Sequence, residues 1–237
     1  MTPAGYTRPA IDAGEYRDDA GTVIPYGRRW EGAPYDGFPP EWAYSICPHP
    51  ERFAPLTTVT EAIVAFLAST YDVKVATFDV VDPAEPEEAL PEAVRRHLRE
   101  RAAWAKLWVR VTVLTPTRPG AAALAFLFTE SEDGFPGGAV FAGESLDHRT
   151  AGCGCDACDD SIEALADDLE ECVFAVVEGH AFERVRDGAL QRGYDVPGWG
   201  SSMRTTPGNR RNREVRRRVA DAVRARGSEK FRAWVSP

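Results

Sequence analysis

Two neighbouring segments in the middle of the chain constrain its fold most. Leu107–Leu114 alternates between apolar and polar side chains, and Ala121–Thr129 is apolar at nearly every position. The linker Thr115–Gly120 holds two prolines and ends in glycine, so the two segments are predicted to form a β-hairpin. A strand that is apolar on both faces has to be covered on both faces. The second segment is therefore predicted to be a central strand of a sheet.

Further helices and strands are predicted from the spacing of apolar residues along the chain. Helices are expected at Pro55–Thr70, Pro91–Lys106, Ser161–Val177 and Asn212–Ala225. Additional strands are expected at Val73–Val81, Ala139–Ala142 and Phe182–Arg186, whereas Gly193–Gly200 is expected to be a turn-rich loop. The predicted class is α+β, a mostly antiparallel sheet of about four or five strands packed with two to four helices.

The 237 residues can form one domain with a substantial core. Residues 1–54 are rich in Gly, Pro and aromatic side chains without periodicity, and we expect an irregular arm that packs on the core. Residues 55–203 are expected to form the α+β core, with a cysteine loop at 153–158. Residues 204–237 are expected to be a basic, helical C-terminal segment.

Charge is distributed unevenly over a chain whose formal net charge is −9. Residues 204–232 hold eleven Lys or Arg and three acids, which gives this segment +8. Such a basic end either docks on the acidic body or binds an anionic partner. Nucleic-acid binding is therefore one possibility, through the arginines of this segment: Arg210, Arg211, Arg213, Arg216, Arg217 and Arg218.

The sequence favours a reducing cytoplasmic location without membrane attachment. No apolar run approaches the roughly 18 residues that a membrane span needs, and the N-terminus lacks a signal-peptide pattern. Three of the five cysteines crowd into six positions, which is more typical of a metal or redox site than of a secreted disulfide framework.

The segment Ala151–Asp160, AGCGCDACDD, carries the strongest chemical signal. Its thiols, Cys153, Cys155 and Cys158, are expected to bind a structural zinc ion, which takes four nitrogen or sulfur ligands. His148 is the nearest candidate for the fourth ligand, and Cys47 or His49 is an alternative that would pin the arm to the core. Two other interpretations stay open: free thiols in a loop, and a redox pair of Cys155 and Cys158.

Three segments together resemble an uncharacterised actinobacterial family, the domain-of-unknown-function family 6226. They are YSICPHPERFAPL at Tyr44–Leu56, YDV at Tyr71–Val73 and CGCDACD at Cys153–Asp159. The resemblance implies no known activity, cofactor or catalytic residue. The family pattern tends to have Asn before the Pro-Glu-Arg-Phe run, where this chain has His49, and this weakens a ligand role for His49 or Cys47.

No familiar catalytic signature is present, neither GxSxG, HExxH, a phosphate-binding loop nor a dinucleotide glycine pattern. The first functional hypothesis is a non-catalytic module that binds another protein and holds structural zinc. The second is an enzyme, either metal-dependent or thiol-redox, that uses the cysteine cluster. The third is the nucleic-acid binder.

Overall fold

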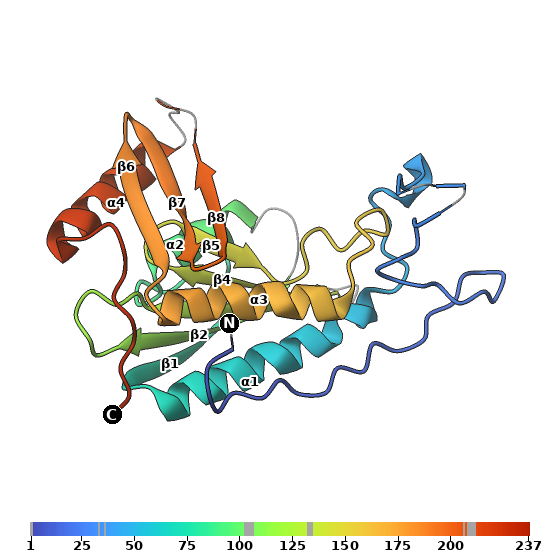
Figure 1. The fold of residues 1–237 in the computed structure, drawn as a ribbon, viewed down its shortest axis with the longest axis horizontal. Helices are drawn as coiled ribbons and strands as arrows, with labels where there is room; N and C mark the ends of the chain where they lie inside the picture. Colours follow the sequence, from blue (N-terminus) through green and yellow to red (C-terminus); the bar gives the residue numbers. More distant parts are fainter. Residues whose placement is uncertain are drawn as a thin grey trace.

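The computed structural model describes residues 2–32, 34–35, 37–101, 107–131, 135–205, 207 and 212–237. Within these residues the fold is α+β, with two antiparallel sheets (Figure 1). The larger sheet has the order β1-β2-β3-β4-β5 and the smaller one the order β6-β7-β8. The bounds of the larger sheet's strands are Val73–Val80, Leu107–Pro116, Leu124–Ser131, Pro136–Ala142 and Leu146–Arg149. Those of the smaller sheet's strands are Ala181–Arg186, Ala189–Val196 and Trp199–Arg204.

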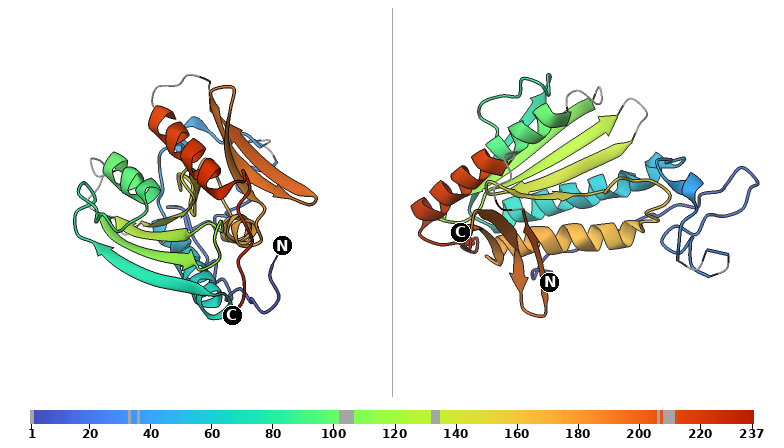
Figure 2. Two further views of the ribbon diagram at one scale, coloured as in Figure 1. Left: turned by 90° about the vertical axis from the view of Figure 1, so that its left-hand side faces the viewer. Right: turned by 90° about the horizontal axis from the view of Figure 1, so that it is seen from above.

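The larger sheet is covered on both faces (Figure 2). Helices α1 (Ala54–Thr70) and α3 (Ile162–Val177) pack on one face, over a core that includes Leu124 and Phe126. Helix α2 (Glu92–Arg101) packs on the other face, against alternate residues such as Leu127. The predicted hairpin and the central position of its second strand are confirmed, because β3 is the middle strand and Leu124–Phe128 is buried throughout.

Helix α4 (Arg213–Arg226) packs on the smaller sheet through Val215 and Val219, which contact Leu190. The C-terminal segment then returns to the larger sheet. The backbone N–H of Phe231 donates to Ala181 O at 3.1 Å, and the Trp234 indole donates to Ala122 O at 3.0 Å. These contacts fix the position of the smaller sheet relative to the larger one.

The second hairpin of the smaller sheet differs from the sequence-based expectation. Gly193–Gly200 was expected to be a loop, but Ala189–Val196 and Trp199–Arg204 form a hairpin. Gly193 lies inside β7. Only glycine fits at this position, because the carbonyl oxygen of Ser201 would lie 2.0 Å from an added Cβ. A glycine inside a strand often marks such a close approach of two backbones.

The expectation that no segment is long and apolar enough to span a membrane needs correction for one segment. Pro50–Thr70, which comprises the short helix η2 (Pro50–Phe53) and α1, passes that test by length and composition, with a mean hydropathy of 1.4. The buried side chains of α1 include Leu56, Val59 and Ile63, which pack in the core between the sheet and α3. Core helices of globular domains pass the same test, so we interpret α1 as a core helix.

The N-terminal residues pack on the core first and then extend beyond it. Tyr6 is buried against Phe66 and Phe174, and its hydroxyl donates to Glu170 at 2.8 Å. From there the chain runs to the far end of α1 and α3, where the described part of residues 16–49 forms turns and the short helix η1 (Glu41–Ala43) (Figure 1). This end of the molecule also holds the loop between β5 and α3.

Candidate metal centre

The three clustered cysteines lie in the loop between β5 and α3, and their sulfur atoms converge. The Sγ atoms are 3.1 Å apart for Cys153 and Cys155, 2.9 Å for Cys153 and Cys158, and 3.6 Å for Cys155 and Cys158. Gly152 and Gly154 make this possible, since both have positive φ angles that let the backbone reverse on either side of Cys153. All five cysteines of the chain are free thiols.

This arrangement is compatible with three of the four ligands of a tetrahedral zinc site. Zn–S bonds of about 2.3 Å at tetrahedral angles place two sulfur ligands roughly 3.8 Å apart. The observed separations are somewhat shorter, so the loop needs only to open slightly to admit an ion. The expectation that the three thiols come together is confirmed, and the cluster can hold a metal ion.

The surroundings of Cys155 favour its thiolate state. Burial raises its pKa, but hydrogen bonds from Cys153 and from the backbone N–H groups of Cys158 and Ser45 outweigh burial and lower the pKa to about 7. The pKa of Cys158 is raised instead, because its thiol donates hydrogen bonds to Cys153 and Cys155 and because burial disfavours its charge. N–H donors to a sulfur also orient it, as the groups around metal ligands commonly do.

His148, the expected fourth ligand, does not lie at the sulfur atoms. It pairs with Val140 across β4 and β5 and faces the core that α3 covers. Its Nδ1 lies 3.5 Å from the sulfur of Cys172, and burial lowers its pKa. The reason is the two-residue alternation of a strand, which directs His148 under α3, whereas the cysteine loop begins only after β5 has ended.

The alternatives for a fourth ligand lie on the arm. Cys47 is close enough to the cluster for the charge of Cys155 to contribute to its raised pKa, although burial is the main cause. His49 instead lies against Tyr16, and its Nε2 is 3.1 Å from Arg17 O. Neither residue belongs to the group whose ligand atoms lie within 4.8 Å of one another.

Asp156, between Cys155 and Cys158, fastens the arm to the cysteine loop. Its carboxylate is 1% exposed, accepts a hydrogen bond from Tyr26 Oη at 3.1 Å and forms an ion pair with Arg29. Its carbonyl oxygen accepts the Trp30 indole N–H at 3.0 Å, and its backbone N–H donates to Ile46 O at 2.9 Å. A single residue of the loop thus contacts four residues of the arm.

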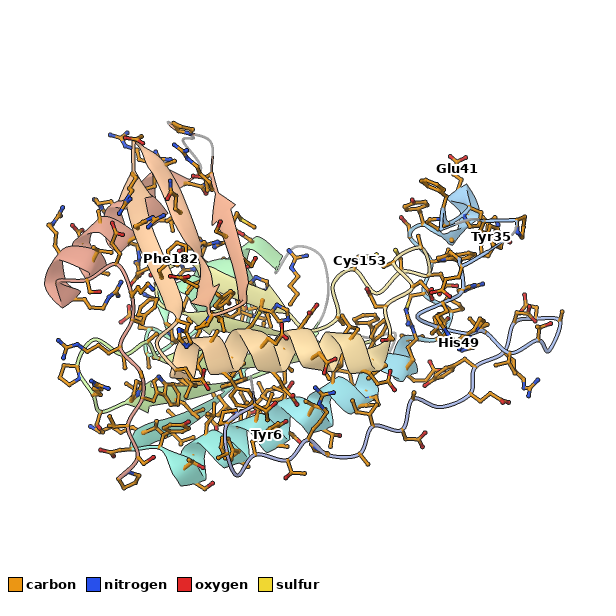
Figure 3. All side chains as sticks on the ribbon, in the orientation of Figure 1. Tyr6, Tyr35, Glu41, His49, Cys153 and Phe182 are labelled. Atoms are coloured by element: carbon orange, nitrogen blue, oxygen red, sulfur yellow. The ribbon has the colours of Figure 1, made fainter. Side chains whose placement is uncertain are left out.

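A second acid and a buried arginine complete this junction. The Asp159 carboxylate accepts the backbone N–H groups of Gly27 and Arg29, at 2.9 and 2.7 Å. Arg52 is 1% exposed, donates to Asp160 O at 2.8 Å and has its guanidinium 3.9 Å from the ring centroid of Tyr26. Figure 3 shows Cys153 on the loop facing the part of the arm that carries Tyr35, Glu41 and His49. Sequence reasoning found the sulfurs but not Asp156, whose partners are more than 100 residues away.

Only part of the basic C-terminal segment is available to a ligand. Arg213 and Arg217 are exposed on α4, but Arg218 forms an ion pair with Glu144 at 2.8 Å. Arg216 is half-buried and also has an interaction within the protein. Arg210 and Arg211 lie outside the described residues.

Replacing Gly154 by Ala is expected to lower the free energy of unfolding by about 2 kcal/mol or more, through backbone strain and overpacking. Gly154 has a φ of +68°, and an added Cβ would meet the Phe135 ring at 2.5 Å. Gly188→Ala is the matched control, because Gly188 has a φ of +70° and nothing lies within 4 Å of an added Cβ. Chemical denaturation should show the larger loss for Gly154→Ala, and equal losses would contradict the contact with Phe135.

Comparison with known proteins places this geometry in a family. A model of a family of unknown function, DUF6226, matches residues 12–236. No curated protein matches the chain, and no solved structure does. The matched region contains most of the arm, both sheets and the cysteine loop, and the chain belongs to the DUF6226 family of unknown function.

Proposed function

We propose that this protein is a non-catalytic protein-interaction module of the cytoplasm, in which a structural zinc ion holds the cysteine loop and the arm presents the binding surface. The observation that carries the proposal is the convergence of three sulfurs in the loop that anchors the arm. A metal bound there would stabilise the position of both segments.

The donor set supports a structural ion. Thiolate-rich sites that are closed by a fourth protein ligand are typical of structural zinc. We assign Cys47 as that fourth ligand. The adjacent Ile46 accepts a backbone hydrogen bond from Asp156, and the charge of Cys155 contributes to the raised pKa of Cys47. The two carboxylates nearest the cluster, Asp156 and Asp159, are already engaged with the arm.

The arm next to the cluster carries the surface expected of a binding module. Phe38 is 80% exposed, and Trp42, Tyr44 and Ile46 are also exposed. Aromatic side chains are enriched at protein interfaces, where they supply most of the binding free energy. Since Trp42 packs on Trp30, which bonds to Asp156, the aromatic surface is coupled to the cysteine loop.

The double variant Trp42→Ala, Tyr44→Ala is expected to lose a protein partner that the wild type retains, by at least tenfold in affinity. Affinity capture from the cytosol of the native organism, followed by titration of the captured protein, measures this change. Val81→Ala is the control, because Val81 is 95% exposed but lies at the end of β1, away from the arm. A partner bound equally by all three proteins would place the interface elsewhere.

Nucleic-acid binding is a second candidate, favoured by the exposed arginines Arg213, Arg217 and Arg224 along α4. A fluorescence titration with duplex DNA at two salt concentrations tests it, because phosphate contacts make affinity fall steeply with salt. Salt-insensitive binding, or none at micromolar protein, would remove this candidate.

A further inference from the structure

A cavity lies on the opposite side of β5 from His148. This cavity of about 360 Å³, open to solvent, lies between α2, β5, the smaller sheet and the start of α4. Asp147 and Arg149 face it because they flank His148 along the strand and therefore point to the face that α2 covers. Its volume falls in the range of about 300–1,000 Å³ that small-molecule sites occupy.

Three guanidinium groups from three separate elements line the cavity. They belong to Arg96 on α2, Arg149 on β5 and Arg192 on β7. Arg192 is held in place by Asp147 at 2.7 Å. The side chains of Arg96 and Arg149 make no ion pair or hydrogen bond with any residue that the structure describes.

The charged side chains that line the cavity have a positive net charge. Asp147 and Glu100 are the carboxylates of the lining, and Asp147 is already paired with Arg192. Three arginines of the lining therefore face two carboxylates. The start of α4, where Asn212 lines the cavity and forms no side-chain cap, adds the positive end of a helix dipole.

Apolar side chains form one part of the lining, beside polar residues such as Ser145 and Thr205. The side chains of Phe141, Leu146, Leu190 and Val215 are buried and contribute to it. The His97 ring packs edge-on against Phe141, with centroids 5.0 Å apart. A ligand that fits would combine an anionic group with a small apolar body.

We propose that this cavity binds a small organic anion, a carboxylate or phosphate monoester on an apolar or aromatic body. The guanidiniums of Arg96 and Arg149 pair with the anionic group, since planar guanidinium matches the oxygens of either anion in a two-pronged hydrogen bond. Phe141 and its apolar neighbours contact the body of the ligand. This site is separate from the cysteine cluster and does not depend on zinc.

Calorimetric titration of the full chain at low ionic strength tests the proposal with four probes: phenyl phosphate, benzoate, inorganic phosphate and neutral benzyl alcohol. Saturable binding of phenyl phosphate or benzoate is expected, with benzyl alcohol at least tenfold weaker. Comparing the two organic anions distinguishes a phosphate site from a carboxylate site. Comparing inorganic phosphate with phenyl phosphate measures how much the apolar body contributes to the affinity. Absence of saturable binding by both organic anions, or equal binding of benzyl alcohol, would overturn the proposal.

The variants locate the site. Arg96→Gln with Arg149→Gln should weaken binding at least tenfold, whereas Arg96→Lys should retain part of it. Arg224→Gln is the control, since Arg224 is an exposed arginine of α4 outside the cavity lining. The melting temperature of the double variant should stay near that of the wild type, because neither arginine has a partner among the described residues. Unchanged binding by a folded double variant would sink the assignment.

Discussion

Replacing Cys155 by Ser is expected to remove a stoichiometric zinc ion and to lower the melting temperature by about 10 °C. The sulfur of Cys155 accepts two backbone hydrogen bonds and lies within 3.6 Å of both other sulfurs, so its loss opens the site. An ion present at a thousand times its Kd stabilises the folded state by about 4 kcal/mol. In a chain of this size each kcal/mol is worth roughly 2–4 °C. Elemental analysis and calorimetry measure the two effects.

Cys172→Ser is the matched control for this experiment. The Cys172 sulfur lies on α3 against His148 and hydrogen-bonds with Tyr194, away from the cluster. The control should therefore keep its zinc, and a chelator should destabilise it as it does the wild type. Metal-free wild-type protein in which Cys155 is alkylated rapidly would contradict the structural ion and favour thiol-redox chemistry.

Four strands of the larger sheet, β1 to β4, could be predicted because their signals are local, whereas β5 was not predicted. Leu124–Phe128 is apolar at every position, and this alone places β3 in the middle of a sheet covered on both faces. The β7–β8 hairpin was missed because Gly193, Pro197 and Gly198 suggest a loop. The Asp187–Gly188 pair between β6 and β7 is a two-residue turn signal that indicates a hairpin at this point.

The candidate site also has a part that could be predicted from local sequence and a part that could not. The three sulfurs lie within six residues, so their spacing alone predicts that they meet. The position of His148 depends on how β5 pairs with β4 and on which face α3 covers, and neither follows from local spacing. The role of Asp156 depends on an arm that is 110 to 130 residues away in the chain and has no periodicity from which to place it.

Replacing Glu183 by Ala is expected to lower the free energy of unfolding by about 4 kcal/mol at pH 5. Glu183 on β6 is fully buried, and its carboxylate accepts the backbone N–H groups of Glu144, Ser145 and Leu146 in the turn before β5. The Ser145 hydroxyl donates to it as well, at 2.7 Å. An Ala leaves these buried donors without an acceptor, at about 1–3 kcal/mol each before relaxation. Urea denaturation measures the loss, with Glu178→Ala as the control because Glu178 is half-exposed just after α3.

The same carboxylate should make stability depend on pH in a defined direction. Burial raises the pKa of Glu183 above its ordinary value of 4.5, against the opposing hydrogen bonds of Ser145 and Glu144 and the charge of Arg226. A raised folded-state pKa gives a contribution that is complete below pH 4.5 and is lost as pH rises through the folded-state value. The stability of the wild type relative to Glu183→Gln should therefore fall as the pH increases from 4 to 8. A difference that grew over this range would mean that the turn before β5 holds Glu183 with a lowered pKa, as a carboxylate bound by several N–H donors can be.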